Sequence, residues 1–258
     1  MRTVRTVVDG RGTIRLEALP LPFAGPAATD EDARRAGELS KAAIEVLPFA
    51  RPADLPRPAA DSRFLIFVVA GGLDLEASDT RARLHPGDVL LTGTGPDALC
   101  CISTPPGTRL LGIRVSDSWA PGGTVPPATE PTGGPREPLL EEMFVRDGIA
   151  HFRRFDRLFA DAPATQALNG LSFLVFSPGH AGTWHTDTNI NLVCVTSGAL
   201  ELEVGGDSAV RRFGPGDVCL VQDQHGQGHI LRAHRETRIL AARLPGLHRW
   251  NTTRQGEQ

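Results

Sequence analysis

Short stretches in which apolar and polar residues alternate recur along the chain and predict β-strands. Leu73–Glu76 and Leu200–Glu203 place leucine at every second position, so one face of each segment is apolar and the other polar. We also expect short strands at the mostly apolar segments Leu171–Phe176 and Ile239–Leu244. Glycine and proline separate these runs, and the whole pattern predicts an all-β fold.

One segment near the N-terminus has a helical period instead. Residues Asp30–Leu47 begin with acidic side chains and then place apolar residues three to four positions apart. This pattern predicts one short helix that extends at least through Ala43.

The chain contains two copies of one pattern. Gly71–Glu76 reads GGLDLE and Gly198–Glu203 reads GALELE, and each copy is followed by Pro-Gly-Asp-Val, at Pro86–Val89 and Pro215–Val218. Proline presets the turn dihedral, glycine allows a tight turn, and aspartate can accept hydrogen bonds from nearby backbone amides. The matched order of strand, turn and strand predicts a duplicated β-domain.

A segment without periodicity separates the two copies. Residues 121–138 (PGGTVPPATEPTGGPREP) are rich in proline, glycine and threonine, which is typical of a linker. We therefore expect an N-terminal domain over residues 1–120, a linker over 121–138 and a C-terminal domain over 139–250.

A histidine motif lies in the second copy. Gly179, His185, Asp187, Asn191 and Gly198 are spaced as in the pattern G-x5-H-x-H-x3-E-x6-G, with aspartate in place of the second histidine and asparagine in place of the glutamate. In its spacing, this segment resembles the first sequence motif of the cupin superfamily.

The resemblance continues downstream. The second cupin motif is represented by the Pro-Gly-Asp turn within Arg211–Asp217 and by His229, with a longer stretch than usual between them. The pair Trp184-His185, the same turn and the segment Asp223–His229 also look like small actinobacterial-type cupin proteins. The resemblance implies two cupin barrels in tandem, of the jelly-roll or double-stranded β-helix type, and covers residues 171–245 well and 43–115 loosely.

By the same resemblance, His185, Asp187 and His229 face into the C-terminal barrel as metal ligands. Two imidazoles and one carboxylate form the facial ligand set of non-haem iron sites, and they also suit manganese, zinc or nickel. Asn191 is a further candidate ligand through its amide oxygen. The sequence leaves two alternatives open: one divalent metal ion per chain, or a metal-free polar pocket.

We expect apolar side chains with a few polar groups around this centre. The candidate substrate-binding residues are Trp184, Phe173, Val193, Gln222 and Arg232. Trp184 could instead pack outward, and Arg232 could lie at the surface. His229 and His225 are the candidates for acid/base catalysis, because imidazole titrates closest to neutral pH.

The first copy lacks these groups. Counted back by the repeat offset, Pro58, Ala60 and Phe64 occupy the positions of the C-terminal histidine, aspartate and asparagine. We therefore expect a degenerate N-terminal barrel with a structural role: it would cover an edge, complete the second barrel or form a dimer interface.

The leading functional hypothesis is a metal-dependent cupin enzyme that acts on a small organic substrate, in an oxidoreductase, dioxygenase-like reaction. The alternatives are a metal-independent cyclase or isomerase of natural-product biosynthesis, and a non-catalytic cupin that binds a small molecule. His185, Asp187, His229 and Arg238 also imitate the pattern of 2-oxoglutarate oxygenases, but the repeat and its turns favour the cupin family.

Composition and charge narrow the partners. The net charge is −3 and the basic residues are spread along the chain, which argues against nucleic acid as a ligand. No apolar run is long enough to span a bilayer, and the N-terminus lacks a signal-peptide core, so we expect a cytoplasmic protein that does not bind membranes. The four cysteines (Cys100, Cys101, Cys194 and Cys219) suggest buried reduced thiols. A homodimer is an open alternative.

Overall fold

The computed structural model describes residues 2–8, 13–19, 21, 45–49, 62–77, 80–93, 101–116, 119, 136–159 and 166–246. In these residues the regular structure consists of strands and two short 3₁₀ turns, which confirms the all-β expectation. The strands of the first half are β1 (Thr3–Val8), β2 (Ile14–Ala18), β3 (Glu45–Phe49), β4 (Ser62–Ala70), β5 (Leu73–Ala77), β6 (Thr80–Leu84), β7 (Val89–Leu91), β8 (Cys101–Ser103) and β9 (Arg109–Ser116).

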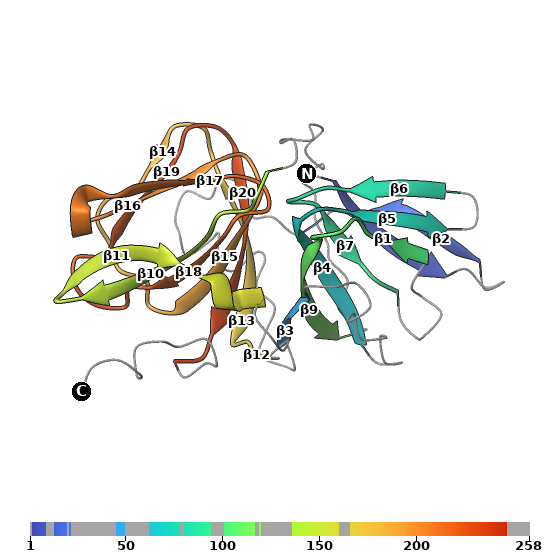
Figure 1. The fold of residues 1–258 in the computed structure, drawn as a ribbon, viewed down its shortest axis with the longest axis horizontal. Helices are drawn as coiled ribbons and strands as arrows, with labels where there is room; N and C mark the ends of the chain where they lie inside the picture. Colours follow the sequence, from blue (N-terminus) through green and yellow to red (C-terminus); the bar gives the residue numbers. More distant parts are fainter. Residues whose placement is uncertain are drawn as a thin grey trace.

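The second half is built in the same way (Figure 1). Its strands are β10 (Leu140–Arg146), β11 (Ile149–Arg154), β12 (Gln166–Ala167), β13 (Gly170–Phe176), β14 (His180–Ala181), β15 (Ile190–Ser197), β16 (Leu200–Val204), β17 (Val210–Phe213), β18 (Val218–Gln222), β19 (His229–Ala233) and β20 (Thr237–Leu244). The 3₁₀ turns are η2 (Asp156–Phe159) and η3 (Gly206–Ser208). Within the described ranges, no helical segment has the length and hydropathy needed to cross a bilayer.

The helix expected over Asp30–Leu47 is wrong at its C-terminal end. Residues 45–47 begin β3, which pairs antiparallel with β9 in the register Val46↔Ile113. Pairing in a sheet outweighs the local helical period at these residues. The rest of the expected helix, residues 30–44, lies outside the described residues.

The two halves have the same sheet topology. The large sheet of the first half runs β12-β3-β9-β4-β7-β1-β2, and that of the second half, read from its other edge, runs β13-β20-β15-β18-β10-β11. From β3 to β2 the two orders correspond strand by strand, including a parallel pair in each, β1 with β7 and β10 with β18. Each half adds a smaller sheet, β6-β5-β8 or β14-β19-β16-β17. This common order supports the duplication inferred from the repeated motifs.

Each Pro-Gly-Asp turn is tied to the first strand of its own half. The carboxylate of Asp88 accepts a hydrogen bond from the backbone amide of Arg2, just before β1. The carboxylate of Asp217 accepts one from the backbone amide of Leu139, just before β10, at 2.7 Å. The aspartate of the motif thus joins the turn to the parallel strand pair in both copies.

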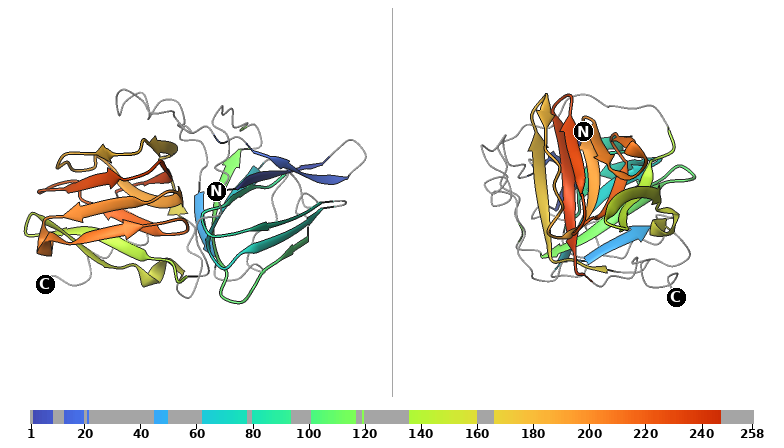
Figure 2. Two further views of the ribbon diagram at one scale, coloured as in Figure 1. Left: turned by 90° about the horizontal axis from the view of Figure 1, so that it is seen from above. Right: turned by 90° about the vertical axis from the view of Figure 1, so that its left-hand side faces the viewer.

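The halves lie side by side (Figures 1 and 2) and share a hydrophobic core. One cluster of buried side chains combines residues of β4, β7 and β9 with residues of β13, β15, β18 and β20, among them Phe67 and Phe173. A second cluster fills the interior of the N-terminal barrel and a third fills that of the C-terminal barrel. The N-terminal barrel therefore covers an outer sheet face of the C-terminal barrel, and β12 from the second half pairs with β3 of the first.

The turns meet reciprocally at this contact. A Cβ atom built on Gly87 would lie 2.6 Å from the Cβ of Pro215, and one built on Gly216 would lie 2.6 Å from the Cβ of Pro86. Such mutual contacts are expected of two copies related by a pseudo-twofold axis. Of the expected linker, residues 121–135 lie outside the described residues.

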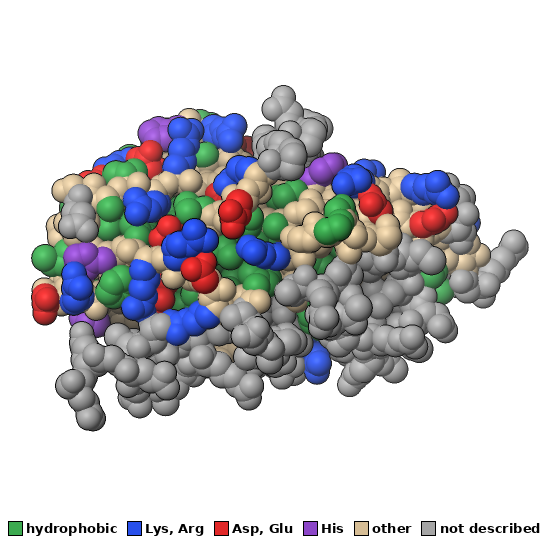
Figure 3. All heavy atoms as spheres, in the orientation of Figure 1, with side chains coloured by type: hydrophobic (Ala, Val, Ile, Leu, Met, Phe, Trp, Pro, Cys, Tyr) green, Lys and Arg blue, Asp and Glu red, His purple; other side chains and the backbone are tan. Residues whose placement is uncertain are grey.

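Charged side chains are mixed on the visible surface of the C-terminal half. Figure 3 shows basic and acidic groups interspersed over the described part of this face. On this face the described residues form no polybasic patch of the kind that binds nucleic acid.

Candidate metal centre

The backbones of His185 and His229 pair directly. His229 is the first residue of β19, and His185 lies outside the strands but forms an isolated antiparallel bridge with it. The amide of His185 donates to the carbonyl of His229 at 3.1 Å, and the amide of His229 donates to the carbonyl of His185 at 2.9 Å. The bridge brings the imidazole centroids to 4.5 Å, with the rings tilted by 49°.

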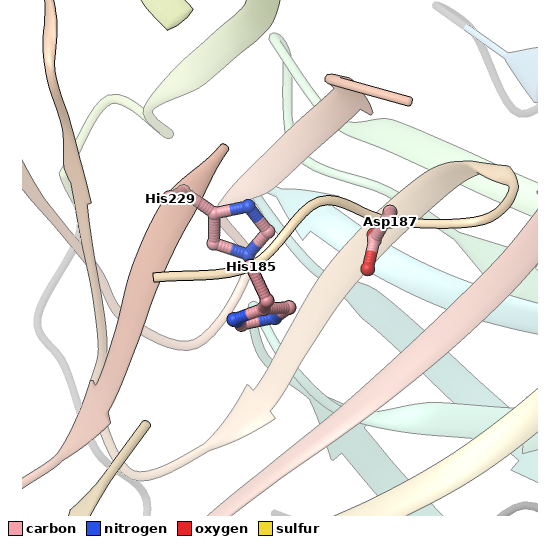
Figure 4. A group of neighbouring side chains, drawn as sticks. All are labelled: His185, Asp187 and His229. Atoms are coloured by element: carbon pink, nitrogen blue, oxygen red, sulfur yellow. The ribbon is translucent and has the colours of Figure 1, made fainter. Parts of the chain in front are cut away.

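Asp187 completes a cluster of three metal-binding side chains. One donor atom each from His185, Asp187 and His229 lies within 4.8 Å of the other two. Figure 4 shows the two rings close together and the Asp187 carboxylate to one side, on the segment that leads into a strand. Ligands of one zinc-like ion bind it at about 2.0–2.2 Å and therefore lie at most about 4.4 Å apart. Donor atoms within 4.8 Å of one another are near this limit, and they would have to move closer to share an ion.

Both histidines have Nδ1 engaged by an oxygen atom, which leaves Nε2 free to bind a metal ion. Nδ1 of His185 lies 2.8 Å from the carbonyl oxygen of Thr183, and Nδ1 of His229 lies 2.6 Å from Oδ2 of Asp223. Carbonyl and carboxylate oxygens accept hydrogen bonds, so in each ring Nδ1 carries the hydrogen. The lone pair of each neutral ring is then on Nε2, the arrangement found in metal-bound histidines.

The centre is closed on one side and open on the other. His229 is 3% exposed and Asp223 is fully buried, whereas His185 is exposed and Asp187 is half-buried. Trp184, next to His185, is 40% exposed. The side of His185 and Trp184 is therefore the one that faces solvent.

Asn191 contacts a candidate ligand. It lies on β15, and its Nδ2 donates a hydrogen bond to Oδ2 of Asp187 at 2.7 Å. The sequence suggested that Asn191 binds metal through its amide oxygen, but here its amide nitrogen is turned to the carboxylate. In this arrangement Asn191 orients Asp187.

Val193 lies on the interior face of β15. It is 8% exposed and belongs to the cluster inside the C-terminal barrel, with Val221 of β18 and Ile239 of β20. Since alternate residues of a strand share a face, Val193 and Asn191 point to the same side.

The placement of Phe173 corrects the expectation that it faces the pocket. It is fully buried in the cluster between the two halves and stacks on Trp119, with centroids 6.2 Å apart. Its neighbours Leu174 and Phe176 pack against the interior cluster instead. The apolar run LSFLVF carries no polar alternation, so its inward face could not be assigned from the sequence.

Gln222 also points away from the centre. Its Nε2 donates to Oε1 of the buried Glu142 at 2.6 Å, and Glu142 also pairs with the half-buried Arg153. Gln222 lies on the opposite face of β18 from Val221. The expectation that Gln222 orients substrate is therefore not met.

Arg232 takes the surface position that the sequence left open. It pairs with Glu201 at 3.5 Å and with Glu203 at 2.6 Å, on strand β16. These pairs lie on the face of β19 opposite to His229. Arg232 is thus held by carboxylates away from the candidate ligands.

Two other residues of the sequence hypotheses stand apart from the cluster. His225 is exposed on the turn between β18 and β19 and does not belong to the three-residue cluster. Arg238 is buried on β20 and pairs with Glu236 at 2.8 Å; it lies on the strand face opposite to Ile239, outside the barrel interior. Arg238 therefore does not lie where the arginine of a 2-oxoglutarate oxygenase would be needed, beside the candidate ligands.

The equivalent end of the N-terminal barrel offers different chemistry. Phe64 faces Arg114 across β4 and β9, as Asn191 faces Arg243 across β15 and β20. The Arg114 guanidinium lies 5.7 Å from the centroid of the Phe64 ring. Pro58 and Ala60 lie outside the described residues, and among the described ones the cluster at His185 is the one group of three possible ligands.

No family model matches the chain, and no curated protein matches it. Solved structures similar to it include a cupin 2 conserved barrel domain protein from Leptotrichia buccalis (11% identity, 81% of each chain covered, TM-score 0.34). A protein of unknown function from Pseudomonas syringae pv. tomato (14%, 94% of this chain and 100% of that chain, TM-score 0.40) is also similar. So is a variant of oxalate decarboxylase from Bacillus subtilis (14%, 80% and 67%, TM-score 0.26). All three TM-scores are below 0.5, so function has to be argued from this chain's own residues.

Proposed function

We propose that this chain is a metal-dependent cupin enzyme whose C-terminal barrel binds one divalent ion through His185, Asp187 and His229 and acts on a small organic substrate. The observation that carries the proposal is the convergence of one donor atom from each of three side chains within 4.8 Å, together with oxygen partners at both Nδ1 atoms that leave each Nε2 free. Two neutral imidazoles and a carboxylate suit iron, manganese, nickel or zinc and leave coordination positions open. When bound, such an ion supplies Lewis-acid or redox chemistry, and we propose an oxygenase-type reaction.

The protein side chains have separable roles in this proposal. His229 is buried and hydrogen-bonded to Asp223, whereas His185 lies on the open side, where we propose that substrate enters. Asp187 provides the negative charge that compensates the cation, and Asn191 holds that carboxylate in place. Val193 shares a strand face with Asn191, so the apolar cluster that fills the barrel interior borders the proposed site.

Metal analysis of the protein purified without a histidine tag tests the proposal. We expect one equivalent of metal per chain in the wild type, and its loss in His185→Ala and His229→Ala. His234→Ala is the matched control, because this exposed histidine pairs with Glu201 on the outer face. A wild type that neither contains nor takes up metal, two equivalents per chain, or metal retained after loss of His185 contradicts the proposal.

A second candidate is a metal-independent cyclase or isomerase, supported by the contact between His229 and Asp223. A buried carboxylate 2.6 Å from Nδ1 orients the ring and leaves Nε2 as the atom that can take up a proton, as a general base requires. The two candidates differ in their response to a chelator. Turnover that persists at full rate in metal-free protein favours the second candidate, and turnover that is lost and then restored by metal favours the first.

A further inference from the structure

Asp223 contacts two of the three ligand-bearing residues. It follows the last residue of β18 and is fully buried. Its Oδ2 accepts a hydrogen bond from Nδ1 of His229 at 2.6 Å, and its Oδ1 accepts one from the backbone amide of Asp187 at 3.4 Å. One carboxylate therefore spans two segments that are far apart in the sequence.

A buried carboxylate is costly unless hydrogen bonds compensate it. Among the described residues the other fully buried aspartate is Asp217, which is compensated by an arginine, by the backbone amide of Gly214 in its own turn and by that of Leu139 just before β10. The hydrogen bonds described for Asp223 go instead to the candidate metal centre. This difference indicates that Asp223 serves the geometry of the centre rather than a turn.

We infer that Asp223 is a positioning residue of the proposed metal centre. It holds His229 as the Nδ1–H tautomer, with Nε2 aimed at the ion, and it fixes the backbone from which the Asp187 carboxylate extends. The inference rests on the proposed function, since the ion is the reason for directing these donors to one point. His185 is independent of it, because a backbone carbonyl, that of Thr183, orients its ring.

The substitution Asp223→Asn tests the two contacts of Asp223, one with the His229 ring and one with the Asp187 amide. Both hydrogen bonds are accepted by carboxylate oxygens, and asparagine has one oxygen and one NH₂ group. If the oxygen keeps the Asp187 amide, the NH₂ group faces Nδ1 of His229 and favours the Nε2–H tautomer, which cannot bind metal through Nε2. If the oxygen keeps His229, the Asp187 backbone loses its acceptor. Either way one of the two ligands is misdirected.

The tautomer of His229 can be read in metal-free protein by nitrogen NMR of ¹⁵N-labelled imidazoles. We expect Nδ1–H for His229 in the wild type and a shift toward Nε2–H in Asp223→Asn, with His185 unchanged. Zn²⁺ titration should show a 10- to 100-fold loss of affinity in the variant. Asp217→Asn is the control: it removes an equally buried carboxylate and should change neither the tautomer nor the Zn²⁺ affinity of the folded protein.

Three results would decide whether Asp223 positions the metal ligands. An Asp223→Asn protein with an unchanged tautomer and unchanged Zn²⁺ affinity overturns the inference. So does an Nε2–H tautomer of His229 in the metal-free wild type, a measurement that does not depend on whether the variant folds. A wild type that binds no metal, but in which the Asp223→Asn substitution shifts the tautomer, refutes the proposed function and still supports the positioning role.

Discussion

Gly228 lies against the backbone of His185, so closely that a Cβ atom built on Gly228 would come within 1.9 Å of the His185 carbonyl oxygen. Gly228 also has a φ of +77°, a conformation that glycine adopts at little cost. The contact lets the next residue, His229, pair with His185 through both backbone hydrogen bonds. A residue without a side chain is therefore part of what brings the two imidazoles together.

We expect Gly228→Ala to weaken Zn²⁺ binding at least ~10-fold, by analogy with the loss of other groups that orient ligands. The methyl group must push the two histidine segments apart, and Zn²⁺ titration measures the effect. Gly179→Ala is the matched control, because Gly179 has a φ of +79° but no atom within 4 Å of its built Cβ. It carries the backbone strain without the collision. Equal Zn²⁺ affinities in the two variants would show that the close contact between Gly228 and His185 is not needed for metal binding.

Asn191→Ala should also reduce Zn²⁺ affinity, by roughly 10-fold, because it removes the hydrogen bond at 2.7 Å that holds the Asp187 carboxylate. The same titration checks this, with Asn189→Ala as the control; the side chain of Asn189 donates to Thr188 and not to Asp187. If Asn191→Ala binds Zn²⁺ as tightly as the wild type, Asp187 either is held by other contacts or is not a ligand.

Phe173→Ala should lower stability and leave Zn²⁺ affinity unchanged. The fully buried ring packs between the two halves, and truncation of a buried phenylalanine costs about 3–5 kcal/mol in the free energy of unfolding. Denaturant unfolding and Zn²⁺ titration of the same protein separate the two effects. A large loss of affinity without a loss of stability would instead return Phe173 to the metal centre.

The sequence predicted those features that depend on local pattern. Alternating leucines and the Pro-Gly-Asp turns identify strands and their duplication, because strand period and turn chemistry are local properties. The convergence of His185, Asp187 and His229 was expected from the resemblance to cupins, and the structure brings their donors within 4.8 Å.

The sequence did not predict which face of an apolar strand is turned inward. Phe173 and Gln222 lie in runs where both faces are buried, so alternation carries no signal, and the partner sheet decides the orientation. Asp223 was missed for another reason. Its position six residues before His229 was visible in the segment DQHGQGH, but only the fold shows that its carboxylate turns inward to the imidazole.

Cys194 and Cys219 should not react with iodoacetamide in the folded protein. Burial raises the pKa of both thiols well above the ordinary value, and the nearby charges of Glu141 and Asp223 raise the pKa of Cys219 further. The thiolate is the nucleophile, so peptide mass mapping should find both sites unmodified in native buffer and both modified in denaturant. Rapid native labelling of either cysteine would mean that the C-terminal barrel opens readily.

Glu141 should make the protein less stable as the pH rises from about 4 toward neutrality. Burial raises the pKa of its carboxyl group, and the Arg211 guanidinium, 3.8 Å away, opposes this shift only in part. Below the ordinary pKa of glutamate, near 4.3, the group is protonated in both the folded and the unfolded chain, so it imposes no penalty. Between that value and the raised folded-state pKa, the unfolded chain releases its proton first, and stability is lost. Glu141→Gln removes this contribution, so the free energy of unfolding of the variant minus that of the wild type should be larger at pH 7 than at pH 4, as measured by denaturant unfolding across this range. Arg211→Gln, which removes the opposing charge, should make the loss of stability with pH larger than in the wild type. If Glu141→Gln changes stability by the same amount at every pH, the carboxylate is solvated in the folded state and its burial does not govern its ionisation.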